Sequence, residues 1–308
     1  MLSERPLRGE DVRGRGFAVD APYAILETLE PGIGRLLARN PSPYTYIGTQ
    51  TYVAGAGAEM VVIDPGPDIP EHVAAIVAAA GERRIVAIAC THTHRDHSPA
   101  ARSLKAATGA PIIGCAALSL ESVGPRADAS FDGDYMPDRV LADGDSIDFG
   151  DGEALVAVAT PGHTSNHLCY SYRGNGAGGA LFTGDHVMGW STTVVVPPDG
   201  DMGCFMASLN LLRKRDDRVF YPAHGALVTN TQQFLRGLIG HRMQREKQIV
   251  RLVGEGKADI PAIVASAYPG LDPRLIPAAG GSVWAHLLDL ERRGMVRSNG
   301  ETWTIART

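Results

Sequence analysis

Cysteine is scarce in this sequence, and the few cysteines lie far apart. The 308 residues contain four, none of them in a Cys-x-x-Cys pair: Cys90, Cys115, Cys169 and Cys204. Small secreted domains that cannot build a sufficient core instead carry dense cysteine frameworks. The spacing excludes a disulfide scaffold and favours a protein of a reducing compartment.

Long apolar segments are also missing. No stretch of 18 apolar residues occurs, and the opening "MLSERPLRGEDVRGRG" is rich in charge and has no apolar core of the kind that signal peptides contain. We therefore expect a soluble, cytoplasmic protein that has no membrane partner.

An excess of positive charge is absent as well. The chain has 29 lysines and arginines against 34 aspartates and glutamates, a formal net charge of −5. This balance gives no generic attraction to nucleic acid or to an anionic membrane. Residues 237–308 differ, because they contain ten basic and seven acidic residues, a net of +3 that leaves −8 for residues 1–236.

Short apolar runs rich in Val, Ile and Ala recur through the first two thirds of the chain. They read "YTYIGTQTYVAG", "AEMVVIDPG", "RIVAIACTH", "ALVAVATPGH", "ALFTGDH" and "RVFYPAHG". Bounded by Gly and Pro, they predict strands, several of them buried on both faces. Segment 68–81 predicts a helix with Asp68 as its N-cap and Gly81 at its end. Strands that alternate with helices predict a layered α/β fold.

After about residue 236 the pattern changes to helices, expected at 241–256, 259–270 and 282–294. In the last of these, Val283, Leu287 and Leu290 form an apolar stripe, and Ser282 is the expected N-cap. Two strand-like pieces follow, "MVRS" and "TWTIA", joined by an Asn-Gly pair that is a strong hairpin signal. The pattern predicts a small winged-helix domain over residues 237–308, after a first domain over residues 1–236.

The segment "THTHRDH" carries three histidines and an aspartate directly after the buried strand "RIVAIAC". Histidine makes up only 10 of 308 residues, so chance clustering is improbable. His92 and His94 lie two apart and point the same way on extended backbone, while Asp96 and His97 follow as the chain turns. Open α/β sheets place their sites at such carboxyl ends, and histidine with carboxylate is the usual donor set for catalytic zinc.

Three further segments place one donor after a strand-like run. They are "ATPGHTSNH" with His163, "LFTGDHV" with Asp185 and "YPAHGA" with His224. Each alone is weak, since a single His or Asp at a strand end is more often structural or solvated. Together with the first cluster they supply seven donors from four strand ends, which is enough for two metals.

The order of these donors resembles the metallo-β-lactamase superfamily over most of residues 40–230. The resemblance implies a four-layer αβ/βα sandwich of two mixed sheets. It also implies one metal held by His92, His94 and His163, a second held by Asp96, His97 and His224, and a bridging Asp185.

A nearer resemblance extends over almost the whole chain. The segments "NPSPYTYIGTQTYVAG", "TTVV" and "HRMQREKQI", and the winged-helix ending, are similar to the β-lactamase-like protein 2 subgroup, which is related to hydroxyacylglutathione hydrolases. Gln50 departs from that subgroup, whose members more often carry Asn before the Thr.

The resemblance implies a mechanism as well. Two zinc ions that share a water lower its pKa and make a bridging hydroxide available near pH 7. Asp96 would be a metal ligand and would also orient this nucleophile. The donor set admits iron or manganese too. The sequence assigns no substrate-binding residue.

Other histidines stand outside this set. Strand alternation points His186 away from the site and favours a structural role. His167 either orients its loop or is simply exposed. His72, His241 and His286 lie on expected helices and are interpreted as surface or satisfied polar groups.

The favoured function is hydrolysis of small esters or thioesters, with a small-molecule substrate ranked above RNA. The resemblance also implies an endoribonuclease for some relatives, yet the expected third winged-helix segment mixes acidic and basic residues, and a net of +3 is weak for binding phosphates. We expect the module to close one side of the cleft or to pack in a homodimer. An iron-dependent sulfur dioxygenase is a less favoured alternative, and the complete donor set disfavours a non-enzymatic DNA regulator.

Overall fold

A computed structural model describes residues 22–118, 131–174 and 179–306. The charged opening stretch, residues 1–16, lies outside this range. Two mixed sheets form the larger part of the molecule, as the resemblance implied. The seven-stranded sheet has the order β1-β2-β3-β4-β5-β6-β7, with antiparallel pairs up to β3/β4 and parallel pairs from β4/β5 onward. Its strands are Glu27–Glu30, Ile33–Leu37, Gln50–Ala54, Glu59–Ile63, Arg84–Cys90, Ile112–Gly114 and Arg139–Val140.

The second sheet has the order β12-β11-β10-β9-β8 and is antiparallel except for the β11/β12 pair. Its strands are Ser146–Asp148 (β8), Ala154–Ala159 (β9), Leu168–Arg173 (β10), Ala180–Gly184 (β11) and Val219–Pro222 (β12). The predicted strand runs of the first two thirds all contain observed strands. The short, less apolar strands β1, β7 and β8 carry weaker signals.

The main core lies between the two sheets. Tyr52 of one sheet packs against Phe182 and Tyr221 of the other, with ring centroids 5.1 and 5.5 Å away. Burying aromatic side chains of this size contributes about 2–3 kcal/mol each. This contact holds the sheets face to face and fixes how their strand ends meet.

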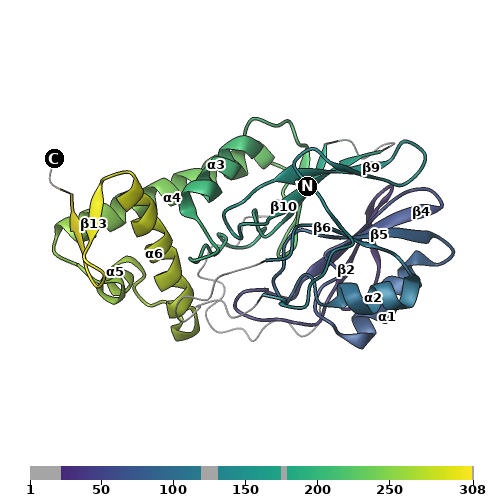
Figure 1. Ribbon diagram of the computed structural model, residues 1–308, viewed down its shortest axis with the longest axis horizontal. Coiled ribbons are helices and arrows are strands. Elements are labelled where there is room, and N and C mark those ends of the chain that lie inside the picture. Colours follow the sequence, from purple (N-terminus) through teal and green to yellow (C-terminus); the bar gives the residue numbers. More distant parts are fainter. Residues whose placement is uncertain (1–21, 119–130, 175–178, 307–308) are drawn as a thin grey trace, which may run out of the picture.

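Helices cover both outer faces and complete four layers (Figure 1). Helices α1 (Pro70–Ala80) and α2 (Ala100–Thr108) bury apolar side chains against the seven-stranded sheet. Helix α3 (Met202–Leu212) and the start of α4 (Thr231–Gly254) cover the other sheet. The described residues contain no helix with the length and hydrophobicity that crossing a membrane requires.

The C-terminal unit has a core of its own. Helices α4, α5 (Ile260–Ala267) and α6 (Ile276–Arg292) pack with a hairpin of β13 (Val296–Ser298) and β14 (Trp303–Ile305), and a short 3-10 turn, Pro273–Leu275, precedes α6. Figure 1 shows this unit beyond one end of the sandwich. Helix α4 runs without a break from one unit into the other and passes the predicted boundary at residue 236, so the division into residues 1–236 and 237–308 stays a prediction.

Two expected helix starts are wrong. Helix α1 is preceded by Ile69, whose side chain makes no capping bond, and Asp68 lies one residue too early to serve as its N-cap. Helix α6 begins at Ile276, well before Ser282, since a proline at its first turn starts the helix there. The backbone of Gly81 does end α1, with a positive φ of 58°.

Candidate active site

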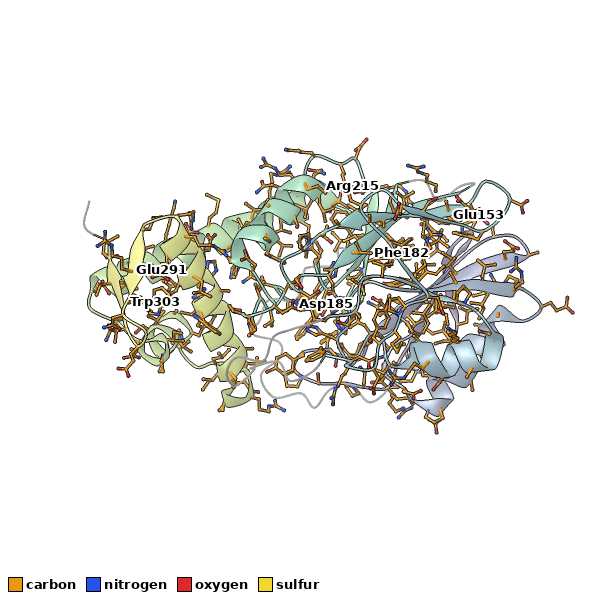
Figure 2. All side chains as sticks on the ribbon, in the orientation of Figure 1. Glu153, Phe182, Asp185, Arg215, Glu291 and Trp303 are labelled. Carbon is orange, nitrogen blue, oxygen red and sulfur yellow. The ribbon has the colours of Figure 1, made fainter. Side chains whose placement is uncertain are left out.

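The seven predicted donors meet at the carboxyl ends of four strands. His92 and His94 follow β5, His163 follows β9, Asp185 follows β11 and His224 follows β12. Asp96 and His97 lie in the turn between β5 and α2, where the backbone N–H of His97 donates to the carbonyl of His94. Figure 2 shows Asp185 at the end of the sandwich that faces the C-terminal helices.

Four of the donors form a first group. Nδ1 of His94 lies 3.0 Å from Nε2 of His92 and 3.1 Å from Nε2 of His163, and Oδ2 of Asp185 lies 3.6 Å from Nε2 of His163. All four side chains are buried, and their donor atoms lie within 4.8 Å of one another. Such a group could hold one metal ion.

Asp96, His97 and His224 form a second group of the same compactness. Oδ2 of Asp96 lies 3.4 Å from Nε2 of His97 and 3.1 Å from Nε2 of His224. The side chain of Asp96 is 25% exposed, whereas both histidines are almost fully buried. Asp96 is therefore the member of the group that a substrate could reach.

Asp185 lies between the two groups. Its Oδ1 is 3.3 Å from Nε2 of His224 and 3.6 Å from Nε2 of His97, while its Oδ2 faces His163. One carboxylate thus presents one oxygen to each group.

A hydrogen bond on the far ring nitrogen orients each of four histidines. Nδ1 of His97 bonds the carboxylate of Asp64 at 3.0 Å, and Nδ1 of His92 lies 3.0 Å from the Thr91 hydroxyl. Nδ1 of His163 and of His224 donates to backbone carbonyls, those of Val194 at 2.6 Å and Gly48 at 3.1 Å. Such partners fix the tautomer and the ring orientation of metal-ligating histidines.

Sequence reasoning missed these partners. Asp64 ends the apolar run of β4, so it had the same signal of an acid at a strand end that identified Asp185. The carbonyls of Val194 and Gly48 have no signal in the sequence, because every residue has a carbonyl.

Gln50, which stands where members of the subgroup more often carry Asn, contacts the backbone on both sides of His224. Its Nε2 donates to the carbonyls of Pro222 and Gly225, at 3.0 and 2.8 Å, and its Oε1 accepts from Arg35. The side chain therefore holds the turn that carries His224.

His167 links the segments that carry the predicted donors His163 and Asp185. Its Nδ1 lies 2.9 Å from the Thr160 hydroxyl, and its Nε2 accepts a hydrogen bond from the backbone N–H of Asp185 at 3.3 Å. Gly184 makes this approach feasible, since its φ is 47° and an added Cβ would come within 2.8 Å of the His167 ring. Of the two roles expected for His167, orientation is the one observed.

The remaining histidines differ. His186 is buried against the Phe205 ring, as a structural role requires, and His72 is buried and hydrogen-bonded to Thr51. His241 is exposed. The expectation for His286 is wrong, because it is buried on α6 and neither ring nitrogen makes a hydrogen bond within the described residues.

The electrostatics of the two groups differ. Burial and the neighbouring His94 lower the pKa of His163 to about 4, and burial with His97 lowers the pKa of His92 well below its usual range. Burial also acts to lower the pKa of His97, but Asp96, Asp185 and Asp64 outweigh it and raise that pKa. His97 in the second group therefore holds a proton more readily than His92 or His163 in the first group.

Two buried atoms support a metal at this place. Within the described residues, Nε2 of His97 and Oδ1 of Asp185 have no hydrogen-bond partner. Leaving a buried polar group unpaired costs about 1–3 kcal/mol. A cation between the groups would satisfy both atoms, so the residues fit the divalent metal binding that this fold implies.

Comparisons with known proteins agree with this geometry. Residues 45–224 match the model of the metallo-beta-lactamase superfamily, and residues 260–303 match that of the beta-lactamase associated winged helix domain. The chain is 30% identical to an atrochrysone carboxyl ACP thioesterase of Aspergillus chevalieri, over 77% of this chain and 70% of that protein. It is 31% identical to a beta-lactamase-like protein 2 homolog of Caenorhabditis elegans, over 75% and 74% of the two chains.

Solved structures share the fold over almost the whole chain. A beta-lactamase domain protein from Burkholderia ambifaria superposes with a TM-score of 0.75 at 17% identity, over 94% of this chain and 96% of that one. A metallo-beta-lactamase family protein from Thermus thermophilus gives a TM-score of 0.69 at 18% identity, over 90% and 100%. The chain is a metallo-beta-lactamase-fold hydrolase with a C-terminal winged helix, and it belongs to the metallo-beta-lactamase superfamily.

Proposed function

We propose that the protein is a dinuclear zinc hydrolase of small thioesters or esters. The observation that carries the proposal is the carboxylate of Asp185, which presents Oδ1 to His97 and His224 and Oδ2 to His163. A single carboxylate so placed suits two metal ions at close spacing better than one.

In this proposal His92, His94 and His163 would hold one metal, Asp96, His97 and His224 would hold the other, and Asp185 would serve both. Two divalent metals, when bound, lower the pKa of water and polarise the substrate carbonyl. Iron and manganese suit the same donors, and zinc is our first choice because histidine-rich sites favour it.

In this proposal Asp96 also orients the attacking water. His97 and His224 hold the pKa of its carboxyl below the usual range, although burial acts in the opposite direction. Asp96 is therefore an ionised acceptor at neutral pH, and its partial exposure lets it accept a hydrogen bond from water beside the substrate.

An aromatic pair next to the site supports an acyl substrate. The rings of Tyr46 and Trp190 stack with centroids 5.1 Å apart, and both side chains are half-buried. The pair adjoins His224, whose carbonyl accepts a hydrogen bond from Gly189. A stacked aromatic pair of this kind suits contact with the apolar part of an acyl group.

Ion pairing in the C-terminal unit argues against RNA. Arg292 of α6 pairs with Asp201 of the catalytic unit at 2.5 Å, and Arg293 pairs with Glu246 and with Asp289. These are the arginines of the third winged-helix segment, and carboxylates already neutralise them. Nucleic-acid binding needs basic side chains that are free for phosphates.

The test is a parallel assay of metal-quantified protein with acyl thioesters, lactones, a β-lactam and single-stranded RNA. We expect two zinc ions per chain, thioester hydrolysis, and a loss of roughly 10²-fold or more in Asp96→Asn. Asp68→Asn, a change at an exposed carboxylate outside the site, is the control and should hydrolyse normally.

Three results would contradict the proposal. RNA cleavage that vanishes in Asp96→Asn, without thioester hydrolysis, would make the protein a ribonuclease. One iron per chain with sulfur-dependent oxygen uptake would make it a dioxygenase. Full hydrolysis in Asp96→Asn with both metals bound would refute the role of Asp96.

A further inference from the structure

Arg242 of α4 is a buried arginine at the junction of the two units. It is only 4% exposed, and its guanidinium lies 5.2 Å from the centre of the Phe205 ring of α3. None of the carboxylates among the described residues pairs with it. Burying a charge in this way costs free energy that hydrogen bonds only partly offset, so its position calls for an explanation.

The guanidinium donates to the backbone carbonyl of Thr193. Thr193 belongs to the segment that follows β11 and its ligand Asp185. The side chain of Arg242 on α4 thus fixes the position of a backbone segment next to the site.

Two consecutive residues of that segment contact two of the proposed metal ligands. The hydroxyl of Thr193 donates to the carbonyl of Asp185 at 2.7 Å and lies 3.3 Å from the carbonyl of His186. The next residue, Val194, accepts the hydrogen bond from Nδ1 of His163 at 2.6 Å. Asp185 and His163 therefore depend on the placement of two consecutive residues.

Arginine suits this task for a physical reason. Burial lowers the pKa of Arg242 to about 10, which still leaves the guanidinium charged at neutral pH. A charged donor makes a hydrogen bond about twice as strong as a neutral one, and the stack on Phe205 fixes the direction of the side chain.

We propose that Arg242 is a positioning residue, through which helix α4, which joins the two units, holds Thr193 and Val194, and with them the proposed ligands Asp185 and His163. The helix that leads into the C-terminal unit is then part of the metal site's support. This inference rests on the proposed metal centre.

The experiment measures zinc affinity by competition with a coloured chelator, on full-length protein, together with the unfolding temperature of the metal-free protein. Arg242→Met removes the donor but keeps the length of the side chain. Thr193→Val removes the hydroxyl at the other end of the same link, and Thr193→Ser restores it. We expect Arg242→Met and Thr193→Val each to weaken zinc binding by roughly 10- to 100-fold, and Thr193→Ser to recover most of the loss.

Arg245→Met is the matched control. Arg245 lies three residues further along α4, stacks on Tyr268 at 3.9 Å and donates to the carbonyl of Ala267, so it acts inside the C-terminal unit. Its loss should lower the unfolding temperature and change zinc affinity by less than about twofold, since none of its contacts reaches the ligands.

The outcomes separate the two proposals. If folded Arg242→Met binds zinc as wild type does, or if Arg245→Met weakens binding as much, the positioning role is refuted while the metal centre stands. Should Arg242→Met not fold, Thr193→Val decides, and its wild-type affinity would refute the role. Wild-type protein that binds no divalent metal would overturn both proposals.

Discussion

Asp64 accepts a hydrogen bond from Nδ1 of His97 at 3.0 Å and so directs Nε2 of His97 at the ligand atoms of the second group. The same carboxylate accepts the backbone N–H and the hydroxyl of Thr91, both at 2.7 Å. All three neighbours donate, so both oxygens of the carboxylate act as acceptors. Asp64 thereby ties the end of β5 to the placement of His97.

Asp64→Asn should weaken the second metal by roughly 10- to 100-fold. The NH2 group of asparagine would face one of the three donors and could not accept its hydrogen bond. Either that donor loses its partner, or the ring of His97 changes to the other tautomer. Asparagine tolerates the left-handed backbone of residue 64, where φ is 48°, as well as aspartate does. Backbone strain therefore does not contribute to the expected loss of metal affinity. Metal content after dialysis against graded chelator measures the effect, and retention of two metals at wild-type affinity would refute it.

Acid should remove the two metals in sequence. The pKa of His163 is lowered to about 4 and that of His92 lies lower than usual, so both are neutral and ready to bind metal well below pH 7. Asp96, Asp185 and Asp64 raise the pKa of His97, so a metal there must displace a proton and its affinity falls as pH falls.

Metal content of protein equilibrated between about pH 8 and about pH 5 checks this order. We expect one metal to leave first. His97→Ala lacks one of the three residues of the second group and should bind only one metal. The metal that leaves first should therefore be absent from this variant, and only the loss at lower pH should remain. Simultaneous loss of both metals from the wild type would contradict the difference between the groups.

The sequence carries clear signals for the seven residues that the structure brings together and weak ones for the residues that orient them, for a physical reason. Each predicted ligand follows an apolar strand, and strand ends meet wherever the sheets form, so His163, Asp185 and His224 could be predicted from local patterns. Thr193 supports Asp185 from across a loop, through contacts that exist only after folding. His286 had a usable signal, since it lies three residues after Val283 and four before Leu290, on the buried face of α6.

Gly184→Ala should destabilise the site as well as the fold. Its φ is 47°, and an added Cβ would lie 2.6 Å from the hydroxyl of Thr91 and 2.8 Å from Nε2 of His167. Backbone strain and overpacking together should cost about 2–4 kcal/mol of unfolding free energy. Gly109→Ala is the control, because φ is 74° there and no atom lies within 4 Å of the added Cβ, so only about 1 kcal/mol is lost. Equal losses in urea unfolding would show that the contacts of Gly184 do not matter.

His286 should make the C-terminal unit sensitive to acid. Burial, with the charges of Arg242, Arg245 and Arg293, lowers its pKa to about 3. The unfolded chain has an ordinary histidine of pKa about 6.5, so between these values the unfolded state binds more protons. Stability from this group is complete above about pH 6.5 and falls as the pH drops toward 3, by up to about 1.4 kcal/mol per pH unit.

His286→Leu fills similar space with an apolar side chain that takes up no proton. The variant should therefore lose less unfolding free energy than the wild type between about pH 7 and about pH 5, by roughly 1–2 kcal/mol. Denaturant unfolding at both pH values, followed by fluorescence of Trp284 and Trp303 in this unit, measures the difference. His241→Leu changes an exposed histidine that is affected by two of the same arginines, Arg242 and Arg245, and it should recover much less of the loss. If His286→Leu lost as much stability on acidification as the wild type, the acid sensitivity would come from other buried histidines with a lowered pKa, such as His72 and His186, and not from His286.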